Sequence, residues 1–242
     1  MRREYHKWFS PNLRLDMEML VFGHSGMPVV VYPTRQGRFF DYENWGLIGA
    51  LRTPIDEGRL ALYCVDSLDS QSLYCTCRSP QARVARLVEY ERYILDEVLA
   101  LVRSERGDRP VASHGCSLGA FHAVNIALRH PDRFQRVVAL SGRYDLTTQT
   151  GPFRALFDGY YSDDVYYQTP PHFVRNIADP ELLRQLRRLD VTLAVGESDV
   201  FRSSTGELGA VLMAKEVPTR LDVWNGEAHR ARDWREMVRR YF

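Results

Sequence analysis

The stretch that decides the fold is Val111-Ala112-Ser113-His114-Gly115-Cys116-Ser117-Leu118-Gly119, which contains the pattern G-x-S-x-G. It begins with a short apolar run that predicts a strand, and the apolar residues of 120–128 predict a helix directly after it. A serine between glycines at such a sharp strand-to-helix turn is typical of a nucleophile elbow, because bulkier neighbours would clash with the strand and the helix. The turn would place the Ser117 hydroxyl at the carboxyl edge of a sheet and aim the Leu118 amide into a site at a helix N-terminus.

Strands and helices alternate on both sides of this turn. Apolar runs bounded by turn residues predict strands over 16–22, 27–32, 60–65, 137–140, 191–195 and 221–224, with an opening strand near 5–9. Ser79-Pro80 is typical of a helix start, and apolar residues at helical spacing continue to Gly107. The chain ends in a helix with one apolar stripe. This alternation predicts an α/β protein with a mostly parallel central sheet, antiparallel N-terminal strands and helices on both faces.

One segment, at about residues 146–185, interrupts the alternation. It contains no clear strand and is rich in aromatic residues, among them Tyr160 and Tyr161. A connection of this length inside a compact domain is usually functional or an inserted cap. We therefore expect a single domain over 1–242 with a cap-like insertion, which acts either as a lid over the site or as a hydrophobic cover for core that the sheet leaves open.

The composition excludes several classes of protein. The 242 residues are 45% hydrophobic and 26% charged with a formal net charge of +1, which gives no reason to expect nucleic acid or an acidic membrane as a partner. The longest apolar runs are too short to span a bilayer, and the N-terminus lacks the apolar core of a secretory signal. The four cysteines form neither a disulfide framework nor a zinc-binding pattern. We therefore expect a cytoplasmic protein with free thiols.

A serine nucleophile needs a base that takes its proton, and the base needs an orienting carboxylate. In a fold with a nucleophile elbow the chain order is serine, acid, histidine. The strand at 191–195 is followed by Gly196-Glu197-Ser198-Asp199, and only one histidine, His229, lies beyond this loop. The order predicts a catalytic triad of Ser117, Asp199 and His229, with Glu197 as the alternative acid.

The sequence resembles the Putative esterase (esterase D-like) family of the α/β-hydrolases over nearly its whole length. The specific parts of the resemblance are the elbow at 115–119 and the terminal loop in which His229 precedes Trp234. It also covers 3–8, 22–24, 31–39, 64–67, 123–125, 158–161 and 196–199. Two places differ from the best-studied members. Pro33-Thr34 stands where they carry His-Gly or Asp-Gly, and Arg230-Ala231-Arg232 follows the histidine in place of acidic and aromatic residues.

The resemblance implies an α/β-hydrolase fold and a serine esterase that cleaves carboxylic esters through an acyl-enzyme on Ser117, with no metal or organic cofactor. By position, the Arg35 amide would be the second oxyanion-hole donor beside that of Leu118. The expected partner is a small-molecule ester. Two alternatives stay open on the sequence: an acyltransferase that uses the same triad, and a catalytically inactive hydrolase-fold protein that binds a partner.

Four further residues are candidates for substrate binding: Arg38, Asp66, Tyr160 and Tyr161. Arg35 and Arg38 follow a strand end near the expected site, where they would bind an anionic group of the substrate or pair with nearby carboxylates such as Asp41. Asp66 ends another strand at the same edge. The sequence has no P-loop, no H-E-x-x-H motif and no G-x-G-x-x-G after an early strand, which disfavours nucleotide-dependent and zinc enzymes.

Overall fold

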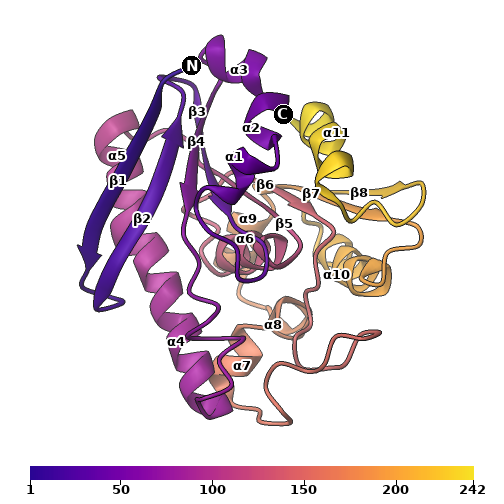
Figure 1. Cartoon of the computed structure of the whole chain (residues 1–242). Helices are drawn as coiled ribbons and strands as arrows, with labels where there is room; N and C mark the ends of the chain where they lie inside the picture. The colour runs from indigo at the N-terminus through magenta and orange to yellow at the C-terminus, as the bar shows by residue number, and fades with distance from the viewer.

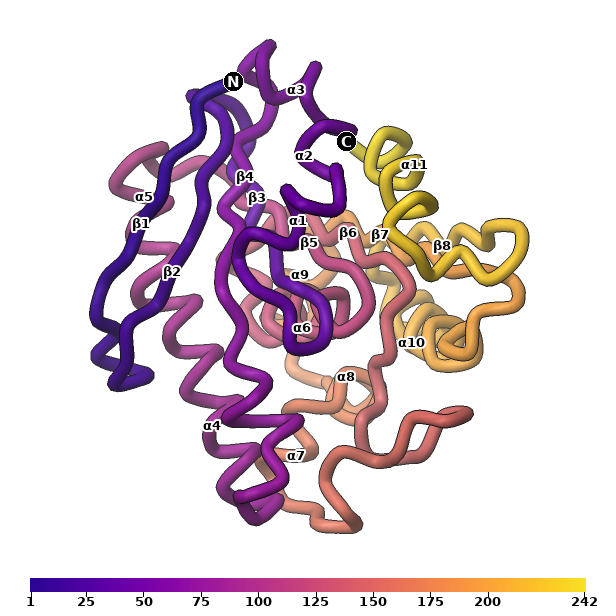
Figure 2. The backbone as a smooth tube through the Cα atoms, viewed as in Figure 1, coloured from indigo at the N-terminus to yellow at the C-terminus, as the bar shows by residue number.

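The computed structural model describes residues 1–242, and its centre is an eight-stranded sheet with helices on both faces (Figures 1 and 2). The strands are β1 (Arg3–Ser10), β2 (Leu15–Phe22), β3 (Met27–Tyr32), β4 (Leu60–Val65), β5 (Ala112–Cys116), β6 (Arg136–Leu140), β7 (Asp190–Gly196) and β8 (Thr219–Trp224). Their order across the sheet is β1-β2-β4-β3-β5-β6-β7-β8. β2 runs antiparallel to both β1 and β4, and every other neighbouring pair is parallel. The expected mostly parallel sheet with antiparallel N-terminal strands is confirmed.

Burial explains the sequence pattern of the strands. All residues of β4 and β5 are buried, because helices cover both faces of the sheet there. Strands buried on both faces are typically continuous apolar runs, as β4 is. β1 is an edge strand, and its residues alternate between exposed and half-buried. It therefore shows the period of two that a half-solvated strand requires.

The helices divide into two layers, one on each face of the sheet (Figure 1). They are α1 (Asp41–Asn44), α2 (Leu47–Ala50), α3 (Arg52–Asp56), α4 (Pro80–Tyr93), the π-helical turn η1 (Ile94–Val98), α5 (Leu99–Arg106), α6 (Leu118–Arg129), α7 (Asp163–Tyr167), α8 (Pro170–Asn176), α9 (Pro180–Leu186), α10 (Arg202–Ala214) and α11 (Ala231–Tyr241). A cluster of 36 buried residues lies between the sheet and the layer that includes α4, α6 and α10. A second cluster of 23 lies under α1 to α3 and α11. Consecutive residues of one strand point to opposite faces and belong to different clusters, as Val30 and Val31 do.

The long helical run of residues 80–106 begins and ends where the sequence predicts. The Ser79 hydroxyl accepts a hydrogen bond from the Ala82 N–H at 3.2 Å, and Pro80 is the first helical residue. Gly107 follows the last helical residue with a φ of +70°, a conformation that glycine adopts without strain.

The segment 146–185 lies between β6 and β7 and contains α7, α8 and most of α9. In place of a strand it has only an isolated bridge between Thr150 and Phe153. It packs against α4 and α6 through a separate apolar cluster of nine buried residues, Leu73, Val84, Leu87, Leu118, Phe121, Leu146, Leu156, Phe157 and Val165. Its Phe173 belongs to the larger core under the sheet. The segment thus covers apolar surface, and its role as a cap in a single domain stays a prediction.

Candidate active site

Ser117 occupies a strained turn between β5 and α6, with a φ of +57° and a ψ of −119°. A Cβ atom on Gly119 would lie 2.3 Å from the carbonyl oxygen of Tyr32, and one on Gly115 would lie 2.2 Å from the carbonyl carbon of Gly119. Only glycine fits at both positions, so the start of α6 packs directly against the end of β3. This packing holds the Ser117 side chain at the carboxyl edge of the parallel strands.

Three side chains from separate loops form one line of hydrogen bonds at this edge. Ser117 follows β5, Asp199 follows β7, and His229 follows β8. The Ser117 Oγ atom lies 3.2 Å from His229 Nε2, and His229 Nδ1 lies 2.8 Å from Asp199 Oδ2. With Nδ1–H donating to the carboxylate, Nε2 is left as the acceptor for the serine hydroxyl. The arrangement is that of a nucleophile, a base and an orienting acid.

Packing fixes the histidine ring as well. The rings of Phe201 and Trp234 both pack against it, with centroids 5.5 Å and 5.4 Å from that of His229. Trp234 Nε1 donates to Ser141 Oγ at 3.1 Å, and Ser141 donates to the carbonyl oxygen of Ala228 at 3.0 Å. The end of β6 therefore holds the residue that precedes His229.

The two candidate acids differ in what they contact. The Asp199 side chain is 1% exposed, and its second oxygen, Oδ1, accepts the Phe201 N–H at 2.9 Å. Glu197 is exposed, and its Oε1 accepts the Gly226 N–H at 3.1 Å. Glu197 thus closes the loop between β8 and His229, and it makes no hydrogen bond to the histidine.

Two backbone N–H groups next to Ser117 are free to bind an oxyanion. The Leu118 N–H is the first of helix α6, where opening N–H groups have no partner inside the helix. The Arg35 N–H donates to no acceptor in the protein. The loop that carries Arg35 is fixed by the buried carboxylate of Asp69, whose Oδ2 accepts the Gln36 N–H at 2.9 Å.

A cavity of about 300 Å³ opens beside these groups. It is lined by Thr34, Arg35, Tyr74, Ser117, Leu118, Arg143, Leu146, Phe153, Phe201, His229 and Trp234. A cavity of this size lies at the lower end of the range for small-molecule sites, and apolar walls with a few convergent polar groups are typical of them.

Comparison with known proteins identifies the family of the chain. The family model described as "Putative esterase" matches residues 69–236, about two thirds of the chain. The chain belongs to the Putative esterase family. Membership makes it a carboxylic ester hydrolase, within the α/β-hydrolase superfamily. No curated protein matches the chain significantly.

Solved structures share the fold of this esterase at low sequence identity. A ferulic acid esterase has a TM-score of 0.75 and 16% identity, over 99% of this chain and 95% of that one. An S-formylglutathione hydrolase from Agrobacterium tumefaciens has a TM-score of 0.73 and 16% identity, over 99% and 92%. FphF, a fluorophosphonate-binding serine hydrolase of Staphylococcus aureus, has a TM-score of 0.68 and 15% identity, over 99% and 96%. At these identities the likeness shows the fold.

Arg38 and Asp66 do not line the cavity of the esterase, in contrast to the sequence-based expectation. Arg38 Nε donates to the Asp66 carboxylate at 2.9 Å, and its Nη2 donates to Glu18 Oε2 at 2.7 Å. Both residues follow strands at the carboxyl edge of the sheet, as expected. Their side chains nevertheless form an ion pair with each other, and Arg38 also pairs with Glu18 of β2. Arg38 therefore pairs with carboxylates, which is the other interpretation of this residue. The backbone N–H of Arg38 also donates to Asp41 Oδ2 at 2.8 Å.

Tyr160 and Tyr161 also lie outside the cavity lining. Tyr160 packs against the apolar cluster of α4 and α6. Tyr161 is 54% exposed, and its hydroxyl lies 2.8 Å from His172 Nδ1. The aromatic segment instead contributes Leu146 and Phe153 to the wall.

Sequence reasoning missed Arg143 and Tyr74 as lining residues. Arg143 comes three residues after the carboxyl end of β6. Ligands of parallel sheets bind at this edge, so its position after the strand could have indicated Arg143 as a lining residue. Tyr74 lies in the irregular loop between β4 and α4, where no periodic pattern exists to orient it.

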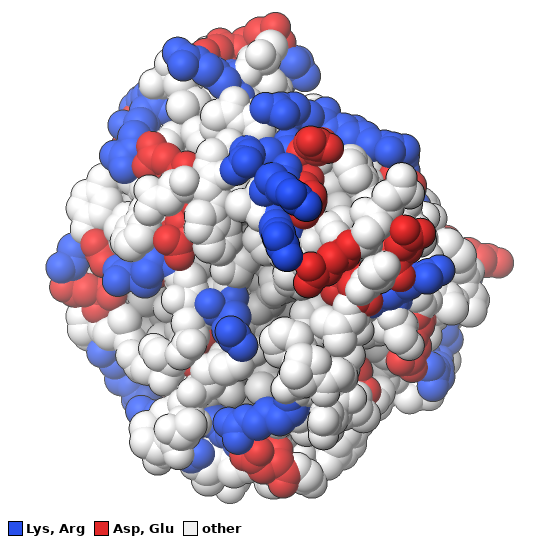
Figure 3. Space-filling model, turned by 45° about the vertical axis from the view of Figure 1, so that its right-hand side comes forward, with Lys and Arg blue, Asp and Glu red and all other residues white.

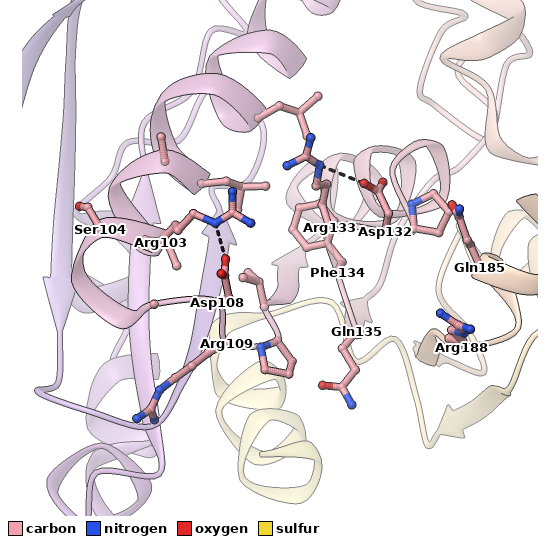
Figure 4. A pocket seen from close by; sticks show the side chains of 18 of the residues that line it. Arg103, Ser104, Asp108, Arg109, Asp132, Arg133, Phe134, Gln135, Gln185 and Arg188 are labelled. Atoms are coloured by element: carbon pink, nitrogen blue, oxygen red, sulfur yellow. Dashed lines mark hydrogen bonds and ion pairs between the residues drawn. The ribbon is translucent and has the colours of Figure 1, made fainter.

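A larger cavity of about 1,060 Å³ lies at the opposite edge of the sheet, near the amino ends of β5 to β7 (Figure 4). Within it Arg103 pairs with Asp108 and Arg133 pairs with Asp132, as the dashed lines show. It contains no activated nucleophile, and catalytic groups of α/β folds lie at the carboxyl edge. The smaller cavity beside Ser117 is therefore the candidate active site.

Outside the cavity, the structure shows one group of possible metal ligands and a surface of mixed charge. One group, Glu4, His6 and Glu105, is close enough together to ligate a metal ion, and it lies on β1 and α5, away from Ser117. Basic and acidic side chains are interspersed on the face seen in Figure 3, in keeping with the near-zero net charge. None of the helices combines the length and the apolarity that crossing a membrane would require.

Proposed function

We propose that the protein is a serine esterase that cleaves small carboxylic esters through an acyl-enzyme on Ser117, with His229 as the base and Asp199 as the acid of a catalytic triad. The strongest support is the continuous line of hydrogen bonds from Asp199 through His229 to Ser117 beside a cavity. The positive φ of Ser117 adds to it, because strained backbone is retained where function needs it.

In the acylation half-reaction, the Ser117 Oγ attacks the carbonyl carbon of the ester while His229 Nε2 takes the hydroxyl proton. The tetrahedral oxyanion accepts hydrogen bonds from the Leu118 and Arg35 amides, each worth about 2.7–4 kcal/mol in the transition state. The bond to the alcohol oxygen then breaks, and His229 gives its proton to the departing alcohol.

In the deacylation half-reaction, water attacks the acyl carbon and His229 Nε2 takes its proton. Collapse of the second tetrahedral intermediate breaks the bond to Ser117, which recovers the proton from His229. The sum is one ester and one water converted into one acid and one alcohol. The Asp199 carboxylate stabilises the imidazolium in each half.

Turnover of p-nitrophenyl acetate and labelling by a fluorophosphonate probe test the proposal. Ser117→Ala should lose both turnover and label, and His229→Ala should lose most of both while the circular dichroism spectrum stays native. Ser203→Ala is the matched control, because Ser203 is an exposed residue of α10 and contacts no part of the cavity. Full activity in Ser117→Ala, or a label that maps to another serine, would refute the assignment. A wild-type protein that takes no label and turns over no ester would indicate a binding protein.

A further inference from the structure

Arg143 is the one buried arginine that has no carboxylate partner. It is 5% exposed, whereas every other buried arginine forms an ion pair with Asp or Glu. Its charge is held by backbone carbonyls instead: Nε donates to Asp145 O at 3.1 Å, and Nη2 donates to Thr148 O and to Arg154 O. Burial of a charge without an ion-pair partner is costly, so a negatively charged ligand beside Arg143 would stabilise it.

One nitrogen of this guanidinium is left for a ligand. Arg143 Nη1 donates to no atom of the protein, and it is not among the buried side-chain atoms that lack a partner. Because Arg143 lines the cavity beside Ser117, the open space that Nη1 meets is the cavity itself. The three carbonyls fix the plane of the group, so little entropy is lost when it binds an acceptor.

A second cation faces the same space. The Arg35 guanidinium lies over the rings of Tyr74 and Phe153, 5.6 Å and 6.0 Å from their centroids. It also forms no ion pair, and no acidic side chain lines the cavity. Burial raises the pKa of Tyr74, and the charges of Arg35 and Arg143 oppose that effect, as expected for two cations that converge on one phenol.

We infer that the site prefers esters that carry a carboxylate, and that Arg143, with Arg35, binds this group while the scissile carbonyl lies at Ser117. This inference rests on the proposed function. A guanidinium with a free N–H edge is the donor best suited to a carboxylate oxygen. The apolar remainder of the wall, formed by Leu146, Phe153, Phe201 and Trp234, suits the short carbon chain between the two groups.

Two esters of similar chain length test the inference. The 4-nitrophenyl monoester of glutaric acid carries a carboxylate at the end of its acyl chain, and 4-nitrophenyl hexanoate is a neutral ester of similar length. For the wild type, kcat/KM should be at least about tenfold higher for the glutarate ester, and the ratio should fall as NaCl is raised. The neutral ester alone reports on the proposed function, and the ratio reports on the carboxylate preference.

Variants of the two arginines locate the effect. Arg143→Gln should reduce the ratio to about one, and Arg35→Gln should reduce it in part while keeping the Arg35 amide. Arg230→Gln is the matched control, because Arg230 follows His229 in the chain but pairs with Glu227 outside the cavity, at 3.6 Å. Arg230→Gln should keep the wild-type ratio. If Arg143→Gln does not fold, Arg35→Gln still tests the inference, because the Arg35 side chain is exposed and its replacement should leave the fold intact.

A binding experiment separates carboxylate recognition from turnover. Monomethyl glutarate, titrated into Ser117→Ala and followed by calorimetry, should bind at least about tenfold more tightly than methyl hexanoate. In the double variant Ser117→Ala/Arg143→Gln this difference should disappear. Equal kcat/KM for the two esters in the wild type, or equal binding of the two methyl esters, would overturn the inference even if Ser117 is the nucleophile.

Discussion

The Asp199 carboxylate is enclosed beneath His229, with Oδ2 2.8 Å from His229 Nδ1 and Oδ1 2.9 Å from the Phe201 backbone nitrogen. Both oxygens are therefore occupied by donors that hold the carboxylate in one orientation. The His229 tautomer with its proton on Nδ1 follows from this contact, because an ionised carboxylate only accepts hydrogen bonds.

Asp199→Asn should lower kcat for p-nitrophenyl acetate by about 1,000- to 10,000-fold, because the amide no longer stabilises the imidazolium or the correct tautomer. Glu197→Gln should change kcat by less than about twofold, since Glu197 is exposed and its hydrogen bond is to the Gly226 N–H. Steady-state kinetics of the two variants decide between the acids. The reverse order of effects would make Glu197 the acid.

Asp69→Ala should lower kcat about tenfold with a smaller effect on KM. The Asp69 carboxylate accepts the Gln36 N–H and lies 3.4 Å from His122 Nε2. It therefore fixes the peptide between Arg35 and Gln36, which directly follows the peptide that carries the Arg35 N–H. Asp69→Asn keeps one acceptor oxygen and should restore part of the loss. If Asp69→Ala loses stability and activity together and Asp69→Asn restores neither, the role of Asp69 is structural only.

Gly119, at the start of α6 in the elbow, can be compared with Gly206 in the middle of α10. Gly119→Ala places a methyl group 2.3 Å from the Tyr32 carbonyl oxygen, so it should displace the elbow and lower kcat/KM at least about 100-fold. Gly206→Ala in α10 meets no atom within 4 Å and should stabilise the fold by about 0.5–1 kcal/mol. Thermal unfolding and ester turnover measure the pair. Normal activity in Gly119→Ala would contradict the close packing of α6 on β3.

Glu91 should make the stability of the protein depend on pH in the acid range. Burial raises the pKa of its carboxyl, but hydrogen bonds from His130 and Gln168 and the charge of Arg129 outweigh burial and hold the pKa below its usual 4.5. A lowered folded-state pKa contributes stability above about pH 4.5, and this contribution is lost as pH falls through the folded-state value. Urea unfolding of the wild type should therefore show this loss below pH 4.5.

Glu91→Gln is the variant that isolates this contribution. It should lower the free energy of unfolding at pH 7 by about 1–3 kcal/mol, because a buried donor is left without its charged acceptor. Its unfolding free energy should also fall less between pH 4.5 and pH 3 than that of the wild type. An identical pH dependence in the two proteins would argue against Glu91 as the titrating group.

The sequence predicts the sheet of this protein well and the side-chain directions around the site poorly. Strands such as Leu60–Val65 are continuous apolar runs, and the elbow glycines leave one possible turn, so local patterns suffice for both. The helix Arg202–Ala214 was not predicted, because Gly206 and the polar residues near its start weaken its apolar stripe. Position after a strand does not say where a side chain points. Arg38 and Arg143 both follow strands at the carboxyl edge, yet only Arg143 faces the cavity.

The most direct test of the central claim is the intact mass of the protein during turnover. Rapid acid quenching of a reaction with p-nitrophenyl acetate should give a population of wild-type protein that is heavier by one acetyl group, with the modification on the peptide that contains Ser117. Ser117→Ala should never gain this mass. Ester turnover without any acetylated protein, or acetylation that persists in Ser117→Ala, would contradict an acyl-enzyme on Ser117.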